Sequence, residues 1–586
     1  MEQNNNNNEV KDGVIKKVGK LLIKLIIIAI FIVGIAGALK IAPNYVKNDI
    51  TDRTNLIINC SNVTGRMKQN LIKDENGVIY LSMEDIKNYY DSEIYFDEEY
   101  NQIVTSSKTK LAVLKLDEDK MTINGTTQEI NSGIKVKGTT YYLPISEMQE
   151  VYNIKISEAE NKVVMESLDK KLTSGKATKK LSIKYKPTIF SRTIEKIEKG
   201  DKVVIAEIEK NSLPSGWLKV RTENGNIGYV EEKNLNNIQV EREDKTYAKQ
   251  INGKVSMAWE YFSKYGSAPD NTGKVYNGVN VVSPSFFYLE LEDTGKENLN
   301  KLDVISQAKV KENVGDKGQL YIQWAHNNGY KVWAKVSNDT IAATIDEFSL
   351  IINDYKLREL LIKDILNYSE KYNLDGINLD FEYVYKQDKD ALSKFIIELA
   401  PQLRNKGICL SVDVTAPNGG DNWSLCYDRN LIGEVADYIV FMGYDQYGTT
   451  KIGTTSSYSW LKNNIDNFLT YEEVPAEKLI LGLPFYTKLW QTQGDTTIKA
   501  TVVGMNNVES SIPSDASKEW QEDLQQYYVQ YERNGYTFKM WVEDEESFTK
   551  KIKLVEQNNL AGAAYWRKGF ETNNLWNIIK QELSLK

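Results

Sequence analysis

The chain has 586 residues, of which 41% are hydrophobic and 26% are charged, and this composition is typical of globular proteins. The net charge of −8 argues against binding of double-stranded nucleic acid, which selects a basic surface. The single histidine, His326, excludes multi-histidine metal sites, and the three cysteines (Cys60, Cys409 and Cys426) show no CxxC spacing. At about 100–200 residues per domain, the length predicts about three to five domains.

An apolar segment follows a lysine-rich amino terminus. Residues 21–39 are apolar except for Lys24. A helix of this length can cross a hydrocarbon core of about 30 Å. Four lysines precede the segment and keep the amino terminus inside the cell. We therefore predict a cytoplasmic tail (1–20), a transmembrane anchor (21–42) in the cell membrane, and an extracellular remainder. The small residues 36–38 leave a second interpretation open, in which the segment is a cleaved signal peptide and the protein is secreted.

Residues 55–168 contain an internal repeat with the pattern strand, short helix, hairpin. Segment 80–104 recurs as 142–164, at an offset of 62 residues that becomes 60 after a deletion. Asn124-Gly125, between the copies, predicts one more tight hairpin. The repeat resembles the copper-amine-oxidase N-terminal-like module of bacterial envelope proteins, which implies a structural or wall-contacting role. Because the segment contains no histidine, we expect no copper or other metal here.

A second small β-rich unit is predicted for residues 181–238. Residues 217–220 and 228–230 read as two alternating strands, and Asn224-Gly225 between them predicts a hairpin with a type I′ turn. This pattern resembles a bacterial Src-homology-3-like domain, a kind attached to cell-wall hydrolases. Its aromatic residues fit either a ligand surface or the core of a small barrel.

From about residue 250 to 586 one theme repeats: a short apolar run, a polar loop, then a segment with helical period. Eight such runs start near Val255, Val279, Lys331, Gly376, Ile408, Tyr438, Leu479 and Ala561. Eight β/α units predict an α/β fold, the (β/α)8 TIM barrel, with functional side chains at the carboxyl ends of its strands. The stretch 491–536 is long for a loop and predicts a small inserted subdomain beside the cleft.

The fourth of these runs, DGINLDFE at residues 375–382, carries a polar row. Side chains alternate along a strand, so Asn378, Asp380 and Glu382 share one face and the apolar residues between them share the other. Since the outer face of a barrel packs on helices, we expect the polar row to point inward. Glu382 lies nearest the open mouth, where burial and the neighbouring Asp380 would raise its pKa, as a general acid requires. A structural row of salt bridges is the alternative interpretation.

This strand resembles the DxxDxDxE signature of glycoside hydrolase family 18, the chitinase-type family, and the resemblance extends over residues 250–586. Met442-Gly443-Tyr444-Asp445 matches the M-x-Y-D element of the family. Trp566 matches the tryptophan that floors the sugar subsite. The asparagine at 378 and the accessory modules are similar to the bacterial cell-wall branch of the family, often found in spore formers, rather than to secreted chitin-digesting enzymes.

The resemblance implies a retaining, substrate-assisted glycosidase. The 2-acetamido oxygen of the sugar would attack the anomeric carbon, while Glu382 would protonate the leaving oxygen and then activate water. Asp380 would orient the acetamido N–H, and Tyr444 would hydrogen-bond the acetamide carbonyl. Further substrate-binding positions would be Asp445, Trp566, Met442 and Asn378. The mechanism needs no metal and no organic cofactor.

Position 378 departs from the family pattern, in which a second aspartate is usual. Asn378 cannot share a proton with Asp380, but we expect its amide to hydrogen-bond Asp380 and fix its orientation. Activity is expected to persist with an altered pH profile that lacks the acid limb set by a pair of aspartates. Asp375 has the opposite parity and is expected to brace the strand, and His326, at the end of a predicted helix, is expected to be structural.

The expected substrate is a glycan that contains N-acetylglucosamine and is cut at β-1,4 linkages. Cell-wall peptidoglycan is favoured, and chitin oligomers are the alternative. The expected partners are this glycan and, through one helix, the membrane, with no nucleic acid. Two further hypotheses are a non-catalytic glycan-binding protein on the same barrel and an envelope scaffold based on the two β modules, but the presence of both Asp380 and Glu382 favours an enzyme. Trp259, Phe286 and Trp333 fit either sugar subsites or barrel packing.

Overall fold

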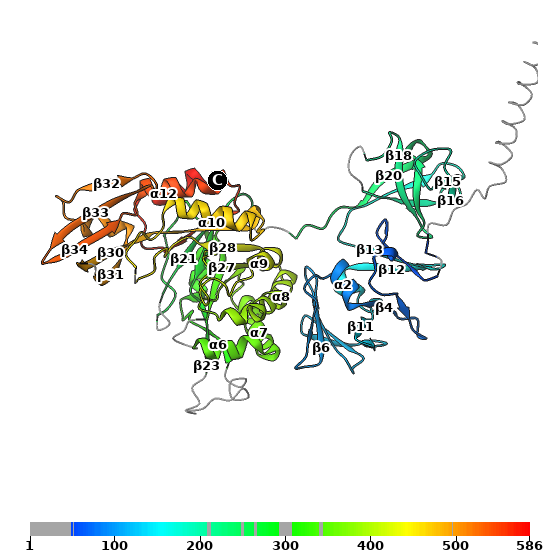
Figure 1. Ribbon diagram of the computed structural model, residues 1–586, viewed down its shortest axis with the longest axis horizontal. Helices are drawn as coiled ribbons and strands as arrows, with labels where there is room; N and C mark the ends of the chain where they lie inside the picture. Colours follow the sequence, from blue (N-terminus) through cyan, green and yellow to red (C-terminus); the bar gives the residue numbers. More distant parts are fainter. Residues whose placement is uncertain are drawn as a thin grey trace, which may run out of the picture. The chain divides into compact units, whose positions relative to one another are not determined.

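In the computed structural model, the described chain runs from residue 49 to 585 apart from 51, 208–211, 248–250, 263–265, 292–307, 339–343, 450 and 495 (Figure 1). The predicted cytoplasmic tail (1–20) and transmembrane anchor (21–42) lie outside the described residues. Among the helices that are described, none combines the length and the apolar character needed to cross a bilayer.

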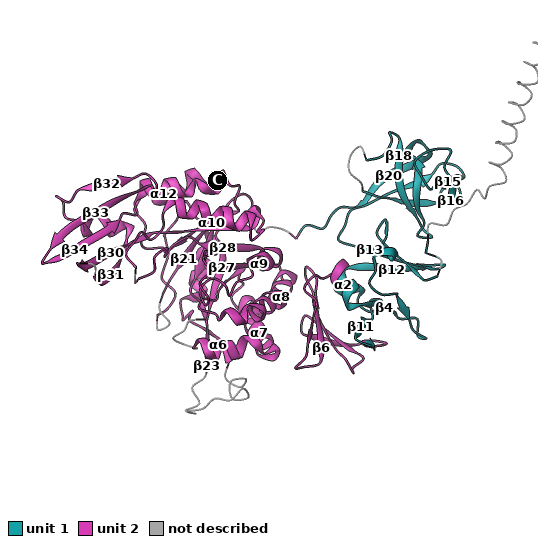
Figure 2. Ribbon diagram, viewed as in Figure 1, with its two compact units in different colours: residues 1–86, 135–246 teal, residues 87–134, 247–586 magenta. Residues whose placement is uncertain are grey.

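The chain forms two compact units (Figure 2). One holds the residues up to 86 and 135–246, and the other holds 87–134 and 247–586. The predicted module 55–168 is therefore divided between them. Within the second unit, the hydroxyl of Tyr95 donates a 2.5 Å hydrogen bond to Oε1 of Glu398, which lies on a helix of the large C-terminal domain.

The internal repeat is confirmed as two copies of strand, helix and hairpin. The first copy comprises β4 (Ile79–Ser82), α2 (Met83–Tyr89), β5 (Tyr95–Asp97) and β6 (Gln102–Ser106). The second comprises β11 (Thr140–Leu143), α3 (Gln149–Tyr152), β12 (Ile154–Ala159) and β13 (Lys162–Ser167). The other strands of this region are β1 (Asn55–Ile58), β2 (Ser61–Asn62), β3 (Ile72–Lys73), β7 (Leu111–Lys115), β8 (Lys120–Ile123), β9 (Thr126–Glu129) and β10 (Lys135–Lys137). Asn124 and Gly125 join β8 to β9 with φ values of 46° and 80°, so this tight hairpin is also confirmed.

Residues 172–242 form a seven-stranded antiparallel sheet with its own small apolar core. Its strands are β14 (Leu172–Ala177), β15 (Leu181–Lys184), β16 (Thr193–Ile197), β17 (Lys202–Ile205), β18 (Trp217–Thr222), β19 (Ile227–Glu231) and β20 (Leu235–Arg242). The hairpin β18–β19 is confirmed, but the predicted type I′ turn is wrong. That turn needs positive φ at both central residues, and of Asn224 and Gly225 only Gly225 has it, at 74°. The amide of Thr222 donates to the carbonyl oxygen of Asn226, so the loop is longer than two residues.

The C-terminal domain is a closed barrel of eight parallel strands, and each predicted run supplies one of them. They are β21 (Val255–Glu260), β22 (Val281–Pro284), β25 (Lys331–Ser337), β26 (Gly376–Asp380), β27 (Cys409–Val414), β28 (Tyr438–Met442), β29 (Leu479–Pro484) and β35 (Gly562–Trp566). β21 pairs with β35, and the pairing of β22 with β25 completes the ring. The TIM barrel is therefore confirmed.

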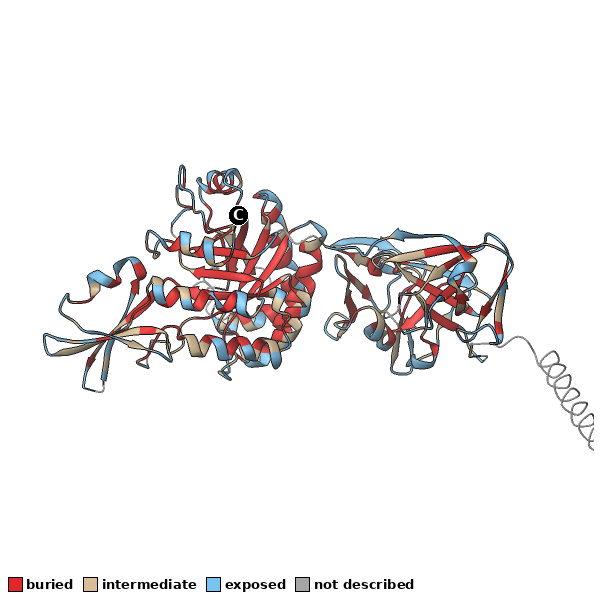
Figure 3. Ribbon diagram, turned by 90° about the horizontal axis from the view of Figure 1, so that it is seen from above, coloured by how far each residue is buried: buried red, intermediate tan, exposed pale blue. Residues whose placement is uncertain are grey.

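Helices surround the barrel strands (Figure 1). They are α5 (Gly318–Asn327), α6 (Ile345–Asn353), α7 (Tyr355–Lys371), α8 (Lys389–Asn405), α9 (Arg429–Val435), α10 (Tyr458–Thr470), α12 (Glu545–Ile552), α13 (Leu554–Gln557) and α14 (Leu575–Glu582). Ile377, Leu379 and Phe381 belong to the large core that includes apolar side chains of α7 and α8. The barrel strands are buried almost throughout (Figure 3).

A separate apolar cluster fills the barrel interior at the amino ends of its strands. Trp333 is fully buried there and stacks on Tyr438, with ring centroids 5.3 Å apart. A Cβ atom on Gly376 would lie 2.4 Å from the indole of Trp333, so only glycine leaves room for that ring. Phe286 is likewise fully buried, in the outer core. Packing is thus the role of Trp333 and Phe286.

Two β structures extend the barrel at its carboxyl end. β23 (Phe287–Leu291) and β24 (Ala308–Glu312) form an antiparallel pair beside β25. The predicted insertion is a five-stranded antiparallel sheet with one short helix, and it is longer than 491–536. It comprises β30 (Tyr486–Gln493), β31 (Thr496–Gly504), α11 (Val508–Ser511), β32 (Lys518–Gln521), β33 (Gln526–Arg533) and β34 (Tyr536–Trp541).

Candidate active site

Two adjoining hollows open where the barrel strands end. The first, of about 180 Å³, is lined by six of the seven predicted site residues, Glu382, Asp380, Tyr444, Asp445, Trp566 and Met442. The second, of about 210 Å³, extends toward β22–β25. Lys335, Asp380 and Glu382 line both hollows. The structure therefore places the carboxyl groups of Asp380 and Glu382, at the end of β26 and just beyond it, at the junction of a divided cleft.

Glu382 lies just beyond the last paired residue of β26, and two side chains from other strands and loops hold its backbone. The amide of Asn338 donates to the carbonyl oxygen of Glu382 and accepts from its N–H, both at 2.8 Å. The hydroxyl of Tyr427 donates to the preceding carbonyl, that of Phe381. This fixed backbone directs the Glu382 carboxyl group into the cleft.

The environment of Glu382 favours the protonated acid. Burial, followed by the negative charge of Asp380, raises the pKa of Glu382 to about 8, although the ammonium of Lys335 opposes the shift. The carboxyl group therefore carries its proton at neutral pH. A proton held at that pH is what a general acid requires.

Asp380 is held on one side and open on the other. Its Oδ2 accepts a 2.6 Å hydrogen bond from the ammonium of Lys335, and both side chains are largely buried. Its Oδ1 is buried and has no hydrogen-bond partner among the described residues. A buried acceptor without a partner is costly, so an open oxygen at a hollow marks a position for a ligand donor.

Asn378 does not bond to Asp380, and this expectation was wrong. The Oδ1 of Asn378 accepts from the indole N–H of Trp259 at 2.7 Å and from the hydroxyl of Ser283 at 3.2 Å. Its Nδ2 donates to Ser411 and to Asp413 at 3.1 and 2.7 Å. These side chains come from β21, β22 and β27 and use the full capacity of the amide, so none is left for Asp380. Asn378 lies below the hollow and does not line it.

Lys335 and Asp413 are the site residues that the sequence reading missed. Asp413 is fully buried, and burial together with the charge of Asp380 raises its pKa well above the ordinary range. Both residues line the first hollow. A signal for both existed, because each is a charged residue that interrupts an apolar strand, in KVWAKVS and in CLSVDV.

Tyr444 and Asp445 follow β28. Burial and the nearby carboxyl groups of Asp413 and Asp380 raise the pKa of Tyr444 well above its ordinary range, so its hydroxyl keeps its proton. Asp445 has a φ of 56°, in the left-handed region. Its Oδ1 accepts from the hydroxyl of Tyr486 at 2.8 Å and from the ammonium of Lys488 at 2.6 Å. Both donors lie on β30, so the inserted sheet orients Asp445.

Aromatic rings line the first hollow. Trp566 ends β35, and its ring centroid lies 5.8 Å from that of Trp259, edge to face. Trp423 lines the hollow from the loop after β27 and contacts the ring of Tyr383, at 5.1 Å. A pyranose ring presents C–H groups on its faces, and aromatic surfaces of this kind suit it. Trp259 therefore lines the site, unlike Phe286 and Trp333.

Asp375 and His326 lie away from the cleft, as expected. Oδ2 of Asp375 bonds to Nε2 of His326 at 2.8 Å, and Oδ1 accepts from the ammonium of Lys331 at 2.8 Å. The backbone N–H of Val332 also donates to Asp375. The bracing role predicted for Asp375 is confirmed. In the described part of the chain, no group of three or more His, Cys, Asp or Glu side chains is arranged to hold a metal ion.

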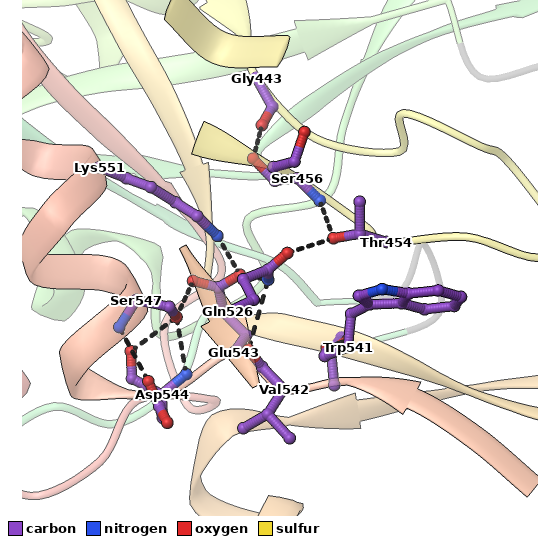
Figure 4. A network of polar contacts seen from close by, with 12 residues as sticks. Gly443, Thr454, Ser456, Gln526, Trp541, Val542, Glu543, Asp544, Ser547 and Lys551 are labelled. Carbon is purple, nitrogen blue, oxygen red and sulfur yellow. Dashed lines mark hydrogen bonds and ion pairs between the residues drawn. The ribbon is translucent and has the colours of Figure 1, made fainter. Parts of the chain in front are cut away.

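A buried polar network joins the inserted sheet to the loop that follows Tyr444 and Asp445 (Figure 4). The ammonium of Lys551 bonds to Glu543 at 2.5 Å, and both side chains are fully buried. The amide of Gln526 donates to the same Glu543 carboxylate and accepts from Thr454. In the same loop, the hydroxyl of Ser456 donates to the carbonyl oxygen of Gly443, 2.6 Å away.

Comparison with known proteins adds to this geometry. The model of Glycosyl hydrolases family 18 matches residues 256–570, more than half of the chain, and the model of the Copper amine oxidase N-terminal domain matches residues 58–167. The chain is 26% identical over 279 residues to the uncharacterized glycosylase YvbX of Bacillus subtilis, which aligns 46% of this chain with 79% of that protein. It is 25% identical over 244 residues to the cortical fragment-lytic enzyme of Bacillus subtilis, which aligns 40% of this chain with 56% of that protein. A crystal structure of a chitinase from Chromobacterium violaceum matches with 21% identity and a TM-score of 0.47, over 57% of this chain and 100% of that chain.

The family match covers the closed barrel and the residues of both hollows. The amino-terminal repeat is a copper amine oxidase N-terminal domain, which fits its two copies of strand, helix and hairpin. With the barrel matched from residue 256 to 570, the chain belongs to glycosyl hydrolase family 18 and is a glycosidase.

Proposed function

We propose that the protein hydrolyses β-1,4 linkages of glycans that contain N-acetylglucosamine, with retention of the anomeric configuration and with the substrate's own acetamido group as the nucleophile. The observation that carries the proposal is the pair of carboxyl groups of Asp380 and Glu382 at the carboxyl end of β26. Glu382 holds a proton to about pH 8, and two residues away Asp380 presents a buried oxygen without a partner. Substrate-assisted catalysis needs one acid and one orienting carboxylate, in place of two reacting carboxylates.

In the first step, the acetamido oxygen attacks the anomeric carbon while the bond to the leaving oxygen breaks. Glu382 gives its proton to the leaving oxygen and becomes a carboxylate. Oδ1 of Asp380 accepts the acetamido N–H and stabilises the positive charge of the oxazolinium ring. The protonated hydroxyl of Tyr444 donates to the acetamide carbonyl, because its raised pKa keeps the proton in place.

In the second step, Glu382 removes a proton from water, and the hydroxide adds to the anomeric carbon. The bond between this carbon and the acetamido oxygen breaks, so the acetamide is regenerated and the configuration is retained. The Glu382 carboxyl group regains its proton, which completes the cycle. Asp445, Met442 and Trp566 hold the sugar in the first hollow, and Asn378 supports the floor from below.

Peptidoglycan is the proposed substrate. The mechanism limits substrates to sugars with an N-acetyl group, which both peptidoglycan and chitin contain. Three features favour the wall: the predicted export of the domain, the resemblance of residues 181–238 to domains attached to cell-wall hydrolases, and the similarity to an enzyme named for lysing cortical fragments. We also propose that the catalytic domain lies outside the cell membrane. Cleavage of the domain by protease added to intact cells would test this placement.

Product analysis tests the substrate and the mechanism together. The purified protein is offered peptidoglycan and chitooligosaccharides in parallel, with Glu382→Gln as the blank. Fragments with reducing N-acetylglucosamine ends from peptidoglycan, first released as the β-anomer, are expected from the unaltered protein only. Cleavage of chitooligosaccharides alone would make it a chitinase. Binding of either glycan without any product would overturn the enzyme in favour of a glycan-binding protein.

A further inference from the structure

We propose that Lys335 is a positioning residue of the reaction, whose ammonium holds one oxygen of Asp380 and leaves the other presented to the substrate. This inference rests on the proposed function and deepens it. It assigns to a lysine on the neighbouring strand the orienting role that the sequence reading gave to Asn378.

The position of Lys335 follows from the pairing of two parallel strands. Lys335 on β25 lies opposite Asn378 on β26, and its side chain reaches up to the next inward residue, Asp380. The ammonium lies 2.6 Å from Oδ2 of Asp380 and 5.9 Å from the ring centroid of Trp566. Lys335 also lines both hollows, so it stands where substrate would pass.

The charges around Lys335 are unbalanced without it. Three carboxyl groups act on the charge of the ammonium: Asp380 at the end of β26, Glu382 two residues beyond it, and Asp413 on β27. Burial alone would lower the pKa of Lys335, but the charge of Asp380, followed by those of Glu382 and Asp413, holds it above the ordinary value. The ammonium of Lys335 therefore stays charged at neutral pH.

The hydrogen bond also selects one orientation of Asp380. With Oδ2 engaged, Oδ1 remains buried and without a partner among the described residues. An aspartate that serves only stability would be expected to satisfy both oxygens. An oxygen that is kept open, at the junction of two hollows, suits the acetamido N–H of a substrate that arrives later. Lys335 thus supplies both the positive charge beside Asp380 and the hydrogen bond that orients its carboxyl group.

The alternative to a positioning role is that the salt bridge of Lys335 and Asp380 only stabilises the barrel. The chain offers a matched control that separates the two. Lys331 lies on the same strand, at its opposite end, and its ammonium bonds to Asp375 at 2.8 Å. Lys335→Met removes the lysine partner of Asp380, and Lys331→Met removes the lysine partner of Asp375. Only Lys335 lies in the cleft.

The test measures kcat, KM and the pH profile of both variants on whichever substrate the unaltered protein cleaves. Lys335→Met is expected to lower kcat by about 100-fold, the size of effect seen when one preorganised electrostatic contact is removed. It is also expected to move the basic limb of kcat/KM to higher pH, because the ammonium of Lys335 no longer opposes the raised pKa of Glu382. Lys331→Met is expected to change the melting temperature without changing kcat or the basic limb. Equal kcat and equal basic limbs in folded Lys335→Met and unaltered protein would overturn the inference.

Two further variants distinguish a loss of positioning from a loss of folding. Lys335→Gln keeps a donor for Asp380 without the charge, and it is expected to show the same displaced basic limb with a smaller loss of kcat. In Lys335→Ala, added ethylammonium is expected to restore kcat in a concentration-dependent way, whereas Lys331→Ala gains nothing. Absence of this rescue in a folded Lys335→Ala protein would contradict the proposal. If the unaltered protein cleaves neither glycan, the proposed function fails first, so the two failures are distinct.

Discussion

The side-chain amide of Asn378 donates a 2.7 Å hydrogen bond to Oδ1 of Asp413 on the adjacent strand. Beneath the cleft, the barrel therefore contains an amide facing a carboxyl group. The carboxyl side chain of this pair is on β27 rather than in the polar row of β26. An amide at 378 lets Asp413 be buried with a donor, which an acid at 378 would not provide once both groups are ionised.

Asn378→Asp is expected to lower the free energy of unfolding by about 1–3 kcal/mol at pH 8, since two buried carboxyl groups would then face each other. The folded-state pKa of the new carboxyl would lie above its unfolded value. The loss is therefore smallest below about pH 4 and grows as pH rises through the folded-state pKa. Urea unfolding at pH 5 and pH 8 measures it. The exchanged pair, Asn378→Asp with Asp413→Asn, restores one donor and one acceptor, and it should recover most of the loss. An exchange variant no more stable than the single variant would contradict the pairing.

The pH dependence of hydrolysis follows from Glu382. A general acid must be protonated in the free enzyme, so kcat/KM is expected to fall as pH rises through about 8. Glu382→Gln cannot donate the proton and is expected to lose about 10²–10⁴-fold in kcat with an unchanged melting temperature. Glu509→Gln, at an exposed pair with Lys518, serves as the control and should match the unaltered protein. A basic limb far below pH 8 would count against Glu382 as the acid.

Trp566 is expected to contribute to binding through its exposed face in the first hollow. Trp566→Ala should raise KM about tenfold, equivalent to about 1.4 kcal/mol, and Trp566→Phe should raise it less because a ring remains. Trp520, on β32 of the insertion, provides a matched control, since its ring contacts Tyr527 at 4.8 Å and does not line either hollow. An effect of Trp520→Ala as large as that of Trp566→Ala would point to a general loss of stability.

The buried ion pair of Glu543 and Lys551 is expected to be important for stability. Burial raises the pKa of Glu543 to about 7, against the pull of Lys551. Lys551→Met removes the cation that opposes the raised pKa of Glu543, so at pH 8 folding must bury an unpaired carboxylate or take up a proton, and the variant is expected to cost about 3–5 kcal/mol. The double variant Glu543→Leu with Lys551→Met removes both charges and should restore most of the stability. Thermal unfolding measures all three proteins, and equal losses in the single and double variants would refute the explanation.

Much of the barrel could be predicted because its signal is local. Alternation in DGINLDFE alone assigns Asn378, Asp380 and Glu382 to one face, and the structure places the intervening Ile377 and Leu379 in the outer core. The eight apolar runs could be counted without knowing how they pair. The repeat at 80–104 and 142–164 was visible for the same reason, since each copy preserves its own pattern.

The contacts of the site could not be predicted in the same way, because they depend on register between strands. Lys335 meets Asp380, and Asn378 meets Asp413, only once β25, β26 and β27 are aligned. The partner expected for Asn378 was its neighbour along the strand, whereas its real partners lie on the adjacent strand β27 and on β21 and β22. The prediction of a type I′ turn at Asn224-Gly225 was wrong for a related reason, since the dipeptide alone does not determine the loop length. The predicted transmembrane segment stays a prediction.

The ring of strands has a consequence for how the protein is made. Val255 of β21 pairs with Gly562 of β35, so the first barrel strand lacks this partner until the last strand has been synthesised. Glu382 and Asp380 are synthesised well before β35, which brings both the closing strand and Trp566. A chain that leaves the ribosome amino end first thus contains Glu382 long before the cleft is complete. A glycosidase built in this order cannot cut glycans while it is still a nascent chain, and its activity begins only with a finished barrel.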